Sequence, residues 1–133
     1  MPAVSGNRAK PVFSDSGWRR KYLYSVHGDI TKVSSYRILK DHTLEHINTI
    51  DIGGRNPVDI TVDRNNKHVI VATLQGGTIY TIDRKNDGSL GEVIAEFTYE
   101  GKEPGKVSTI HQCLWDKKKN FLFACAQSRV NGY

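Results

Sequence analysis

The chain has 133 residues, of which 38% are hydrophobic and 25% are charged, and its formal net charge at pH 7 is +5. This composition is typical of a single folded globular domain and excludes a largely disordered chain. No stretch approaches the roughly 18 consecutive apolar residues of a membrane-spanning helix, and residues 1–17 lack the apolar core of a secretory signal, so we expect a cytoplasmic protein with no membrane contact.

The positive charge is spread along the chain. Basic residues form two short runs, at 19–21 and 117–119, and elsewhere they alternate with acidic residues. A surface that binds nucleic acid usually gathers its basic side chains on one face. We therefore expect no nucleic-acid partner, whereas a net positive charge also suits small anionic ligands.

Three apolar, strand-like segments recur along the chain after an N-terminal lead, residues 1–20, which we expect to be irregular. The segments are KYLYSV (21–26), HVIVAT (68–73) and NFLFAC (120–125), and they start 47 residues (21 to 68) and 52 residues (68 to 120) apart. Val, Ile, Tyr and Phe are frequent in them, as in β-strands. A period of about 40 to 50 residues is the sequence signature of propellers and other repeat folds.

The segments around these cores repeat as well. The two later cores share a lead-in, an apolar strand followed by a polar turn, and residues 56–73 superpose on 108–125 without a gap. Farther along each unit, residues 33–54 match 78–101 as two strands joined by a polar connector, which in the second unit contains the turn sequence NDGS (86–89). Each complete unit therefore contains four strands, and no segment shows the apolar period of a helix.

Four short antiparallel strands in each repeat favour an all-β fold made of propeller blades. A two-sheet sandwich is the alternative, but it would not require the second unit to repeat the first. We expect blades at about 11–54, 55–106 and 107–133, the last of them incomplete. The final strand would then have an unpaired edge, so we expect self-association through open blade edges.

The cysteines and two histidines offer no metal site. Cys113 and Cys125 lie on either side of a predicted hairpin turn, and the expected register places Cys113 opposite Phe123, so we expect two separate thiols, with a disulfide as the alternative. His42 and His46 are four residues apart, but they fall in a strand-connector-strand region rather than on a helix. We expect neither a metal nor a cofactor.

The second unit resembles a known family. Its sequence GRNPVDITVDRNNKHVIVATLQGGTIYTIDRKNDGSLGE (54–92) runs Asn-Pro, apolar strand, Asp, polar turn, apolar strand, Gly-rich step, strand and Asp-Gly-Ser-Leu. The third unit (110–133) repeats the part that runs apolar strand, Asp, polar turn and apolar strand. This order is similar to a blade of the seven-bladed lactonase propellers. The resemblance implies that the chain forms about two and a half blades of a seven-bladed fold.

The resemblance also implies an activity. The lactonase family includes enzymes that hydrolyse 6-phosphogluconolactone in the pentose phosphate route, related enzymes that cyclise carboxymuconate, and members without an assigned substrate. We therefore expect a hydrolase that opens a small anionic sugar lactone with water as the nucleophile. A carboxymuconate cyclase-like activity is one alternative, and a non-catalytic propeller that serves protein contacts is the other.

Two catalytic residues are implied by the family pattern. In the family, a histidine just before the first strand of a blade lines the central channel, and this position is His111 here. Imidazole exchanges protons near neutral pH, so His111 is the candidate general base, the alternative being a histidine held by neighbouring backbone. Arg129 is the candidate to hold the anion and the developing oxyanion. Ala126 and Asn131, however, stand where the family shows Asp and Arg.

Three further residues are candidate substrate-binding groups. Asp59 occupies a position after Pro57 where many family members have histidine, and it is either a channel carboxylate or a residue that caps the start of its strand. Arg55 and Lys106 precede the first strands of their blades. There they either add positive potential for an anionic substrate or are surface charges.

Overall fold

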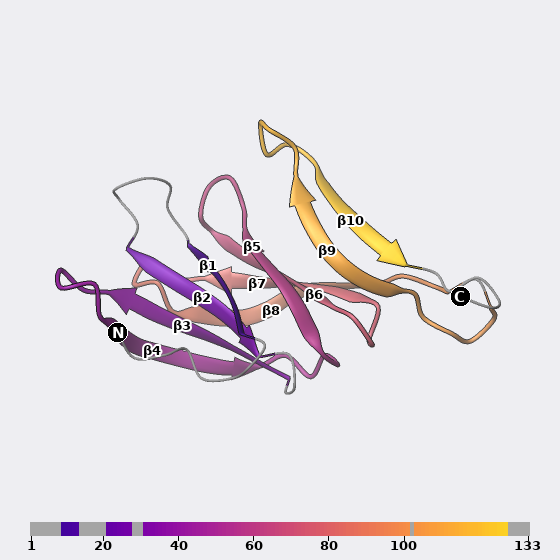
Figure 1. The fold of residues 1–133 in the computed structure, drawn as a ribbon, viewed down its shortest axis with the longest axis horizontal. Coiled ribbons are helices and arrows are strands. Elements are labelled where there is room, and N and C mark those ends of the chain that lie inside the picture. Colours follow the sequence, from indigo (N-terminus) through magenta and orange to yellow (C-terminus); the bar gives the residue numbers. More distant parts are fainter. Residues whose placement is uncertain (1–8, 14–20, 28–30, 102, 128–133) are drawn as a thin grey trace.

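The computed structural model describes residues 9–13, 21–27, 31–101 and 103–127, and every regular element in these ranges is a β-strand (Figure 1). The strands are β1 (Ala9–Phe13), β2 (Tyr22–His27), β3 (Lys32–Ile38), β4 (Leu44–Asp51), β5 (Pro57–Val62), β6 (His68–Thr73), β7 (Thr78–Arg84), β8 (Leu90–Thr98), β9 (Thr109–Trp115) and β10 (Leu122–Gln127). They form three antiparallel sheets with the orders β1-β2-β3-β4, β5-β6-β7-β8 and β9-β10. The predicted all-β fold with four-stranded units is confirmed. Within the described ranges, no helix is long and apolar enough to cross a membrane.

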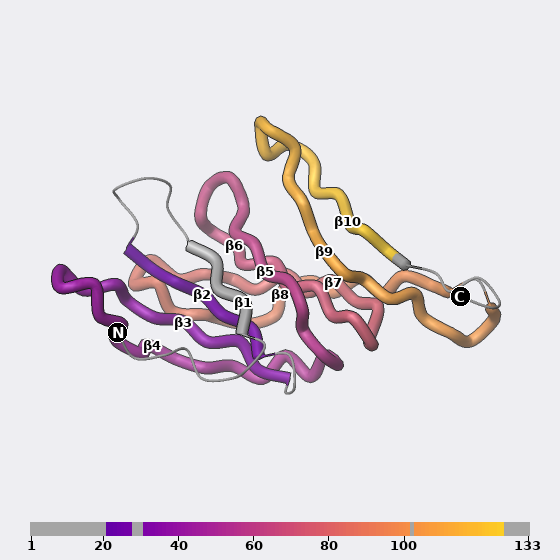
Figure 2. The backbone as a smooth tube through the Cα atoms, viewed as in Figure 1, coloured from indigo at the N-terminus to yellow at the C-terminus, as the bar shows by residue number. Residues whose placement is uncertain are grey.

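The first strands of the three sheets lie next to one another. β5 contacts β1 of the sheet before it and β9 of the sheet after it. The turns that follow β5 and β9 lie on the same, upper side of the molecule in Figure 1. This arrangement is that of consecutive propeller blades, in which the first strand of each blade is innermost. Figure 2 shows the β9–β10 hairpin at one end of the row of blades.

The first strand of the first blade, β1, spans the predicted start of that blade at about residue 11. β1 lies inside the segment 1–20, which is predicted to be irregular, and it pairs with β2 along its whole length. Pro11 is compatible with this strand because an innermost strand has a free edge, where a missing backbone N–H is tolerated. The short sequence AKPVF has no clear strand alternation, so its pairing with β2 is what defines it.

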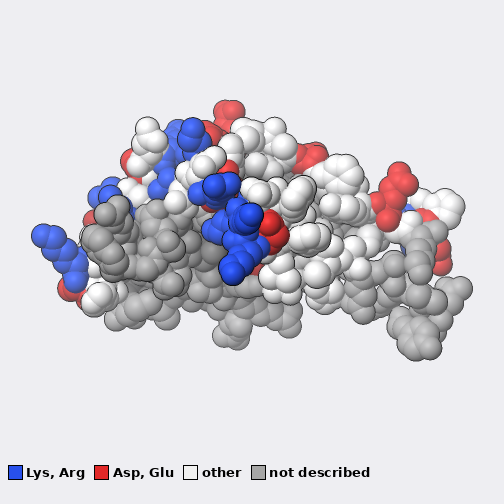
Figure 3. Space-filling view, turned by 90° about the horizontal axis from the view of Figure 1, so that it is seen from above, with Lys and Arg blue, Asp and Glu red and all other residues white. Residues whose placement is uncertain are grey.

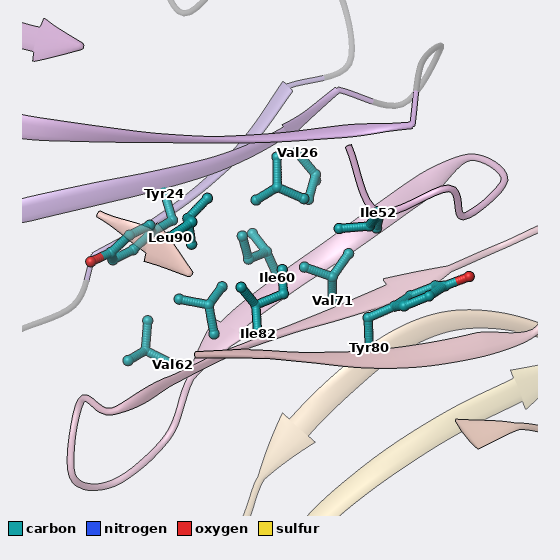
Figure 4. Packing of buried hydrophobic residues seen from close by; sticks show 11 residues of the cluster. Tyr24, Val26, Ile52, Ile60, Val62, Val71, Tyr80, Ile82 and Leu90 are labelled. Carbon is teal, nitrogen blue, oxygen red and sulfur yellow. The ribbon is translucent and has the colours of Figure 1, made fainter. Parts of the chain in front are cut away.

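The first two blades share one hydrophobic core (Figure 4). The buried side chains come from both units: Tyr24, Val26, Val33 and Ile52 from the first, and Ile60, Val62, Val69, Val71, Tyr80, Ile82 and Leu90 from the second. Burying one Val, Leu or Ile side chain of this set contributes roughly 1.5–3 kcal/mol relative to leaving it exposed. Apolar packing between the faces of the sheets is therefore the main attraction between these blades.

Polar contacts fix how these two blades are aligned. The Asn48 side chain in β4 accepts the backbone N–H of Leu90 (3.0 Å) and donates to the carbonyl oxygen of Leu90 (2.8 Å), as a neighbouring strand would. The Tyr24 hydroxyl donates to the Gly88 carbonyl oxygen (2.8 Å) and accepts from Arg84 Nε (2.7 Å). Because hydrogen bonds are directional, these contacts restrict sliding of one blade over the other.

The second and third blades meet through a smaller core and a close approach of backbone. Ala72, Ile110 and Cys113 are buried in this core. Gly77, between β6 and β7, has a φ of +60°, and a Cβ atom placed on it would overlap the carbonyl oxygen of Ser108. Glycine is required there on both counts, since it adopts positive φ readily and has no side chain. The start of β9 is thereby held against the second blade.

Carboxylates cap the turns inside the blades. In the turn after β5, Asp63 Oδ1 accepts the backbone N–H groups of Lys67 (2.8 Å) and His68 (3.1 Å), and Asp63 Oδ2 lies 2.7 Å from His68 Nδ1. Asp116 caps the turn after β9 in the same way, by accepting backbone N–H groups of that turn. Burial raises the pKa of Asp63, but the hydrogen bonds from His68 and Lys67 outweigh burial and hold this pKa below its ordinary value of 3.8.

The substitution Asp63→Asn is expected to lower the free energy of unfolding by about 1–3 kcal/mol near neutral pH, because it removes a charged acceptor. Since the folded pKa is lower than the unfolded one, the carboxylate stabilises the fold above the unfolded value of 3.8, and this contribution disappears as the pH falls through the folded value. Urea unfolding of wild type and variant at about pH 7 and about pH 3 measures the effect. The difference between them should shrink at low pH, and an equal difference at both pH values would contradict the assignment.

Candidate active site

His111 lies near the start of β9, the innermost strand of the third blade. β9 pairs with β10 so that Ile110 is opposite Ala126 and Gln112 is opposite Cys125, which leaves His111 as the extra residue of a β-bulge. The His111 side chain is exposed. A bulge changes the direction of a side chain and is frequent beside active sites. The histidine predicted to be the general base therefore lies outside the regular pairing of an inner strand.

The second blade has a bulge at the equivalent position. β5 departs from regular pairing between Pro57 and Asp59, which leaves Val58 as the extra residue. Val58 is therefore the equivalent of His111, and the two units are offset by 53 residues (58 to 111). The predicted gapless superposition, which has an offset of 52 residues, is wrong by one residue. Asp59 corresponds to Gln112 instead of His111.

Residues in the turns between the strands show that the offset between the two units is 53 residues (63 to 116). Asp63 and Asp116 cap equivalent turns and are 53 residues apart (63 to 116). Asn66 and Lys119 have the same spacing, and both have positive φ angles, of 55° and 56°. The strands on either side are apolar at both offsets, so strand composition could not distinguish between them. The spacing of the capping residues therefore identifies the correct register.

Asp59 is buried between the second and third blades. The residue is 3% exposed. Its Oδ2 accepts the backbone N–H of Cys113 in β9 (2.7 Å), and its Oδ1 accepts the backbone N–H of Ile60 (2.9 Å). These contacts favour the alternative in which Asp59 organises the start of its strand. A direct contact between Asp59 and substrate stays a prediction.

The candidate cations lie before the inner strands. Arg55, before β5, is exposed, and so is Lys106, before β9. Lys106 Nζ is 2.9 Å from Glu103 Oε2, and this hydrogen bond and the charge of Glu103 raise the pKa of Lys106. The neighbouring carboxylate offsets the charge of Lys106, so Arg55 is the stronger of the two as a source of positive potential. Arg129 lies outside the described residues, and its role stays a prediction.

Charges of both signs lie on the face that contains the turns after β5 and β9. Figure 3 shows Lys and Arg side chains near the middle of this face, with Asp and Glu side chains directly beside them. Proteins that bind a phosphate backbone usually present a continuous basic patch. The mixture of charges on the described part of this face is not of that kind.

Cys113 and Cys125 differ in their surroundings, and so do His42 and His46. Cys113 is buried and Cys125 is exposed, and neither forms a disulfide. Cys113 pairs with Ala124, one residue from the predicted partner, because of the same shift in register. His42 lies in a turn with a φ of 66°, whereas His46 in β4 hydrogen-bonds Thr49. Among the described residues, no group of three or more His, Cys, Asp or Glu could hold a metal ion.

Two groups next to His111 are not found by the sequence analysis. One is the backbone N–H of Cys113, which binds Asp59 and which no sequence motif indicates. The other is Gln112, an exposed residue that occupies the position equivalent to Asp59. A superposition anchored on the capping residues Asp63 and Asp116 would have identified Gln112.

Comparisons with known proteins agree with this architecture. A family model described as "Lactonase, 7-bladed beta-propeller" matches residues 8–127. The 6-phosphogluconolactonase of Bacillus subtilis is 26% identical over 106 aligned residues, and the match covers 77% of this chain and 30% of that protein. The 6-phosphogluconolactonase of Formosa agariphila is 28% identical over 115 aligned residues, and the match covers 77% of this chain and 32% of that protein.

A solved structure shows the same fold. The periplasmic gluconolactonase of Pseudomonas aeruginosa superposes with a TM-score of 0.79 at 19% identity, covering 93% of this chain and 38% of that one. The chain spans about a third of the length of these relatives. Since the family model covers nearly all of it, the chain belongs to the lactonase family of seven-bladed β-propellers, as its sequence pattern predicts.

Proposed function

We propose that this chain is part of a lactonase that opens a small anionic sugar lactone by hydrolysis. The observation that supports the proposal best is the position of His111, exposed on a bulge of an innermost strand, in a chain of the lactonase family. The relatives named 6-phosphogluconolactonase point to a phosphorylated sugar lactone as the substrate. The gluconolactonase with the same fold makes the unphosphorylated lactone the natural comparison.

In the proposed reaction, water attacks the carbonyl carbon of the lactone. The His111 imidazole takes a proton from this water as the new C–O bond forms, and the carbonyl oxygen becomes the oxyanion of a tetrahedral intermediate. When the intermediate collapses, the ring C–O bond breaks, and the imidazolium returns its proton to the leaving ring oxygen. The product is the open hydroxy acid, so atoms and charges balance without a further reactant.

Positive charge near the inner strands would bind the anionic group of the substrate. Arg55 is exposed at the start of the innermost strand of the second blade. An arginine can form paired, charge-assisted hydrogen bonds to phosphate or carboxylate oxygens. Arg129, predicted from the family pattern, would be a second such group.

The test is hydrolysis of 6-phosphogluconolactone by the purified chain, with spontaneous ring opening subtracted and the size in solution measured in parallel. The substitution His111→Ala is expected to lower kcat by about 100-fold or more, which is the usual contribution of a general base. His42→Asn is the matched control, because it removes an imidazole from a turn in the first blade, and asparagine tolerates the positive φ there.

Each outcome of this test has a clear meaning. Loss of activity in a folded His111→Ala variant, with the His42→Asn control active, would support the role of His111. Equal activity in wild type and His111→Ala would refute that role. Absence of hydrolysis by a folded, assembled wild-type chain would favour the non-catalytic propeller. Gluconolactone as a second substrate would show whether the phosphate contributes to binding.

A further inference from the structure

The backbone around His111 is held in place by a side chain from the neighbouring blade. The bulge at His111 interrupts the regular ladder of hydrogen bonds between β9 and β10. Two residues farther along, the backbone N–H of Cys113 donates to Asp59 Oδ2 at 2.7 Å. This bond joins the innermost strand of the third blade to that of the second.

The environment of Asp59 makes this hydrogen bond strong and directional. Asp59 is 3% exposed and Cys113 is 5% exposed, so water competes little for either group. A charged acceptor forms a stronger hydrogen bond than a neutral one. The second oxygen, Oδ1, is held by the backbone N–H of Ile60 at 2.9 Å, which fixes the orientation of the carboxylate. The carboxylate is therefore a well-oriented anchor for the backbone of β9.

We infer that Asp59 is a positioning residue for His111. Asp59 acts through the backbone at Cys113. It fixes the conformation of the bulge, and thereby the direction in which the imidazole points. The inference rests on the proposed function, in which His111 is the general base. It assigns to Asp59 a role in the reaction without contact with the substrate.

Packing alone does not account for this carboxylate. The second and third blades already share an apolar core that contains Ala72, Ile110 and Cys113. Burying a carboxylate in such an interface costs free energy, which its hydrogen bonds offset. A buried carboxylate beside that core is explained if Asp59 holds the backbone that follows His111 in one conformation.

The test compares Asp59→Ala and Asp59→Asn with Asp116→Asn. The asparagine side chain at position 59 keeps an oxygen that can accept the Cys113 N–H but loses the charge and the second acceptor. Asp116→Asn is the matched control, because Asp116 caps the turn at the other end of the same hairpin through backbone N–H groups. Each variant is first checked for native secondary structure by circular dichroism. If Asp59→Ala does not fold, Asp59→Asn decides the outcome.

Two measurements separate positioning from a structural role. By NMR, the amide proton of Cys113 and the ring resonances of His111 should shift strongly in Asp59→Ala, less in Asp59→Asn, and little in Asp116→Asn. In the hydrolysis assay, kcat should fall about 10-fold or more in Asp59→Ala with KM nearly unchanged, and Asp59→Asn should restore part of it, whereas Asp116→Asn should keep the wild-type kcat.

The inference and the proposed function fail in different ways. Unchanged His111 resonances in a folded Asp59 variant would overturn the positioning role, and so would an equal change in Asp116→Asn. The NMR result decides this even if the wild-type chain does not hydrolyse the lactone. Failure of the proposed function would show instead as equal activity of wild type and His111→Ala.

Discussion

The substitution Gly77→Ala is expected to destabilise the chain by about 3 kcal/mol or more, the largest effect on stability that we predict. An alanine would have to adopt the φ of +60° that Gly77 has, which costs about 1–2 kcal/mol in the left-handed region. Its Cβ atom would in addition overlap the backbone carbonyl oxygen of Ser108, which cannot move away as a flexible side chain would. The junction between the second and third blades would have to open.

Gly105→Ala is the matched control for this prediction. Gly105 also has a positive φ, of 78°, but a Cβ atom there would meet nothing within 4 Å. Its substitution should therefore cost only the backbone term of about 1–2 kcal/mol. Urea unfolding of both variants measures the difference. Equal destabilisation by the two substitutions would show that the contact with Ser108 relaxes without cost.

The blade pattern could be predicted because it depends on local sequence. The strands around 68–73 and 120–125 combine residues of high β-propensity with polar turns on both sides, and these features repeat in each unit. β1 could not be predicted in the same way. Its five residues form a strand because β2 offers them a free edge, and that information lies in β2 rather than in AKPVF.

The candidate site could be predicted only in part. The family pattern led to His111, and the structure adds the bulge, which depends on the pairing of Ile110 and Gln112 with β10. The contact between Asp59 and the Cys113 backbone joins residues 54 positions apart and involves an amide group that every residue but proline possesses. Sequence composition contains no signal for such a contact. Long-range partners of backbone groups become known only once the blades are placed.

The exposed face of the β9–β10 hairpin is expected to cause self-association of the chain. Leu114 and Phe123 lie directly opposite each other and are 47% and 59% exposed. At the offset of 53 residues (70 to 123), Phe123 corresponds to Ile70 of the second blade, which is only 7% exposed. This position is therefore buried in the second blade, which the third blade follows, and exposed in the third blade. Large exposed apolar side chains on a two-stranded sheet favour association.

Light scattering of the chain, whose monomer mass is 14.9 kDa, is expected to give a larger mass, and the double variant Leu114→Lys, Phe123→Glu is expected to return it to the monomer. Opposite charges on directly opposed residues keep the hairpin paired, so the variant changes the face without breaking the strands. Ile94→Lys with Phe97→Glu is the control, because these residues of β8 are 55% and 61% exposed on the outermost strand of the second blade. A monomeric wild type would contradict the prediction. Dissociation by the control alone would place the association on β8 instead of the open blade face.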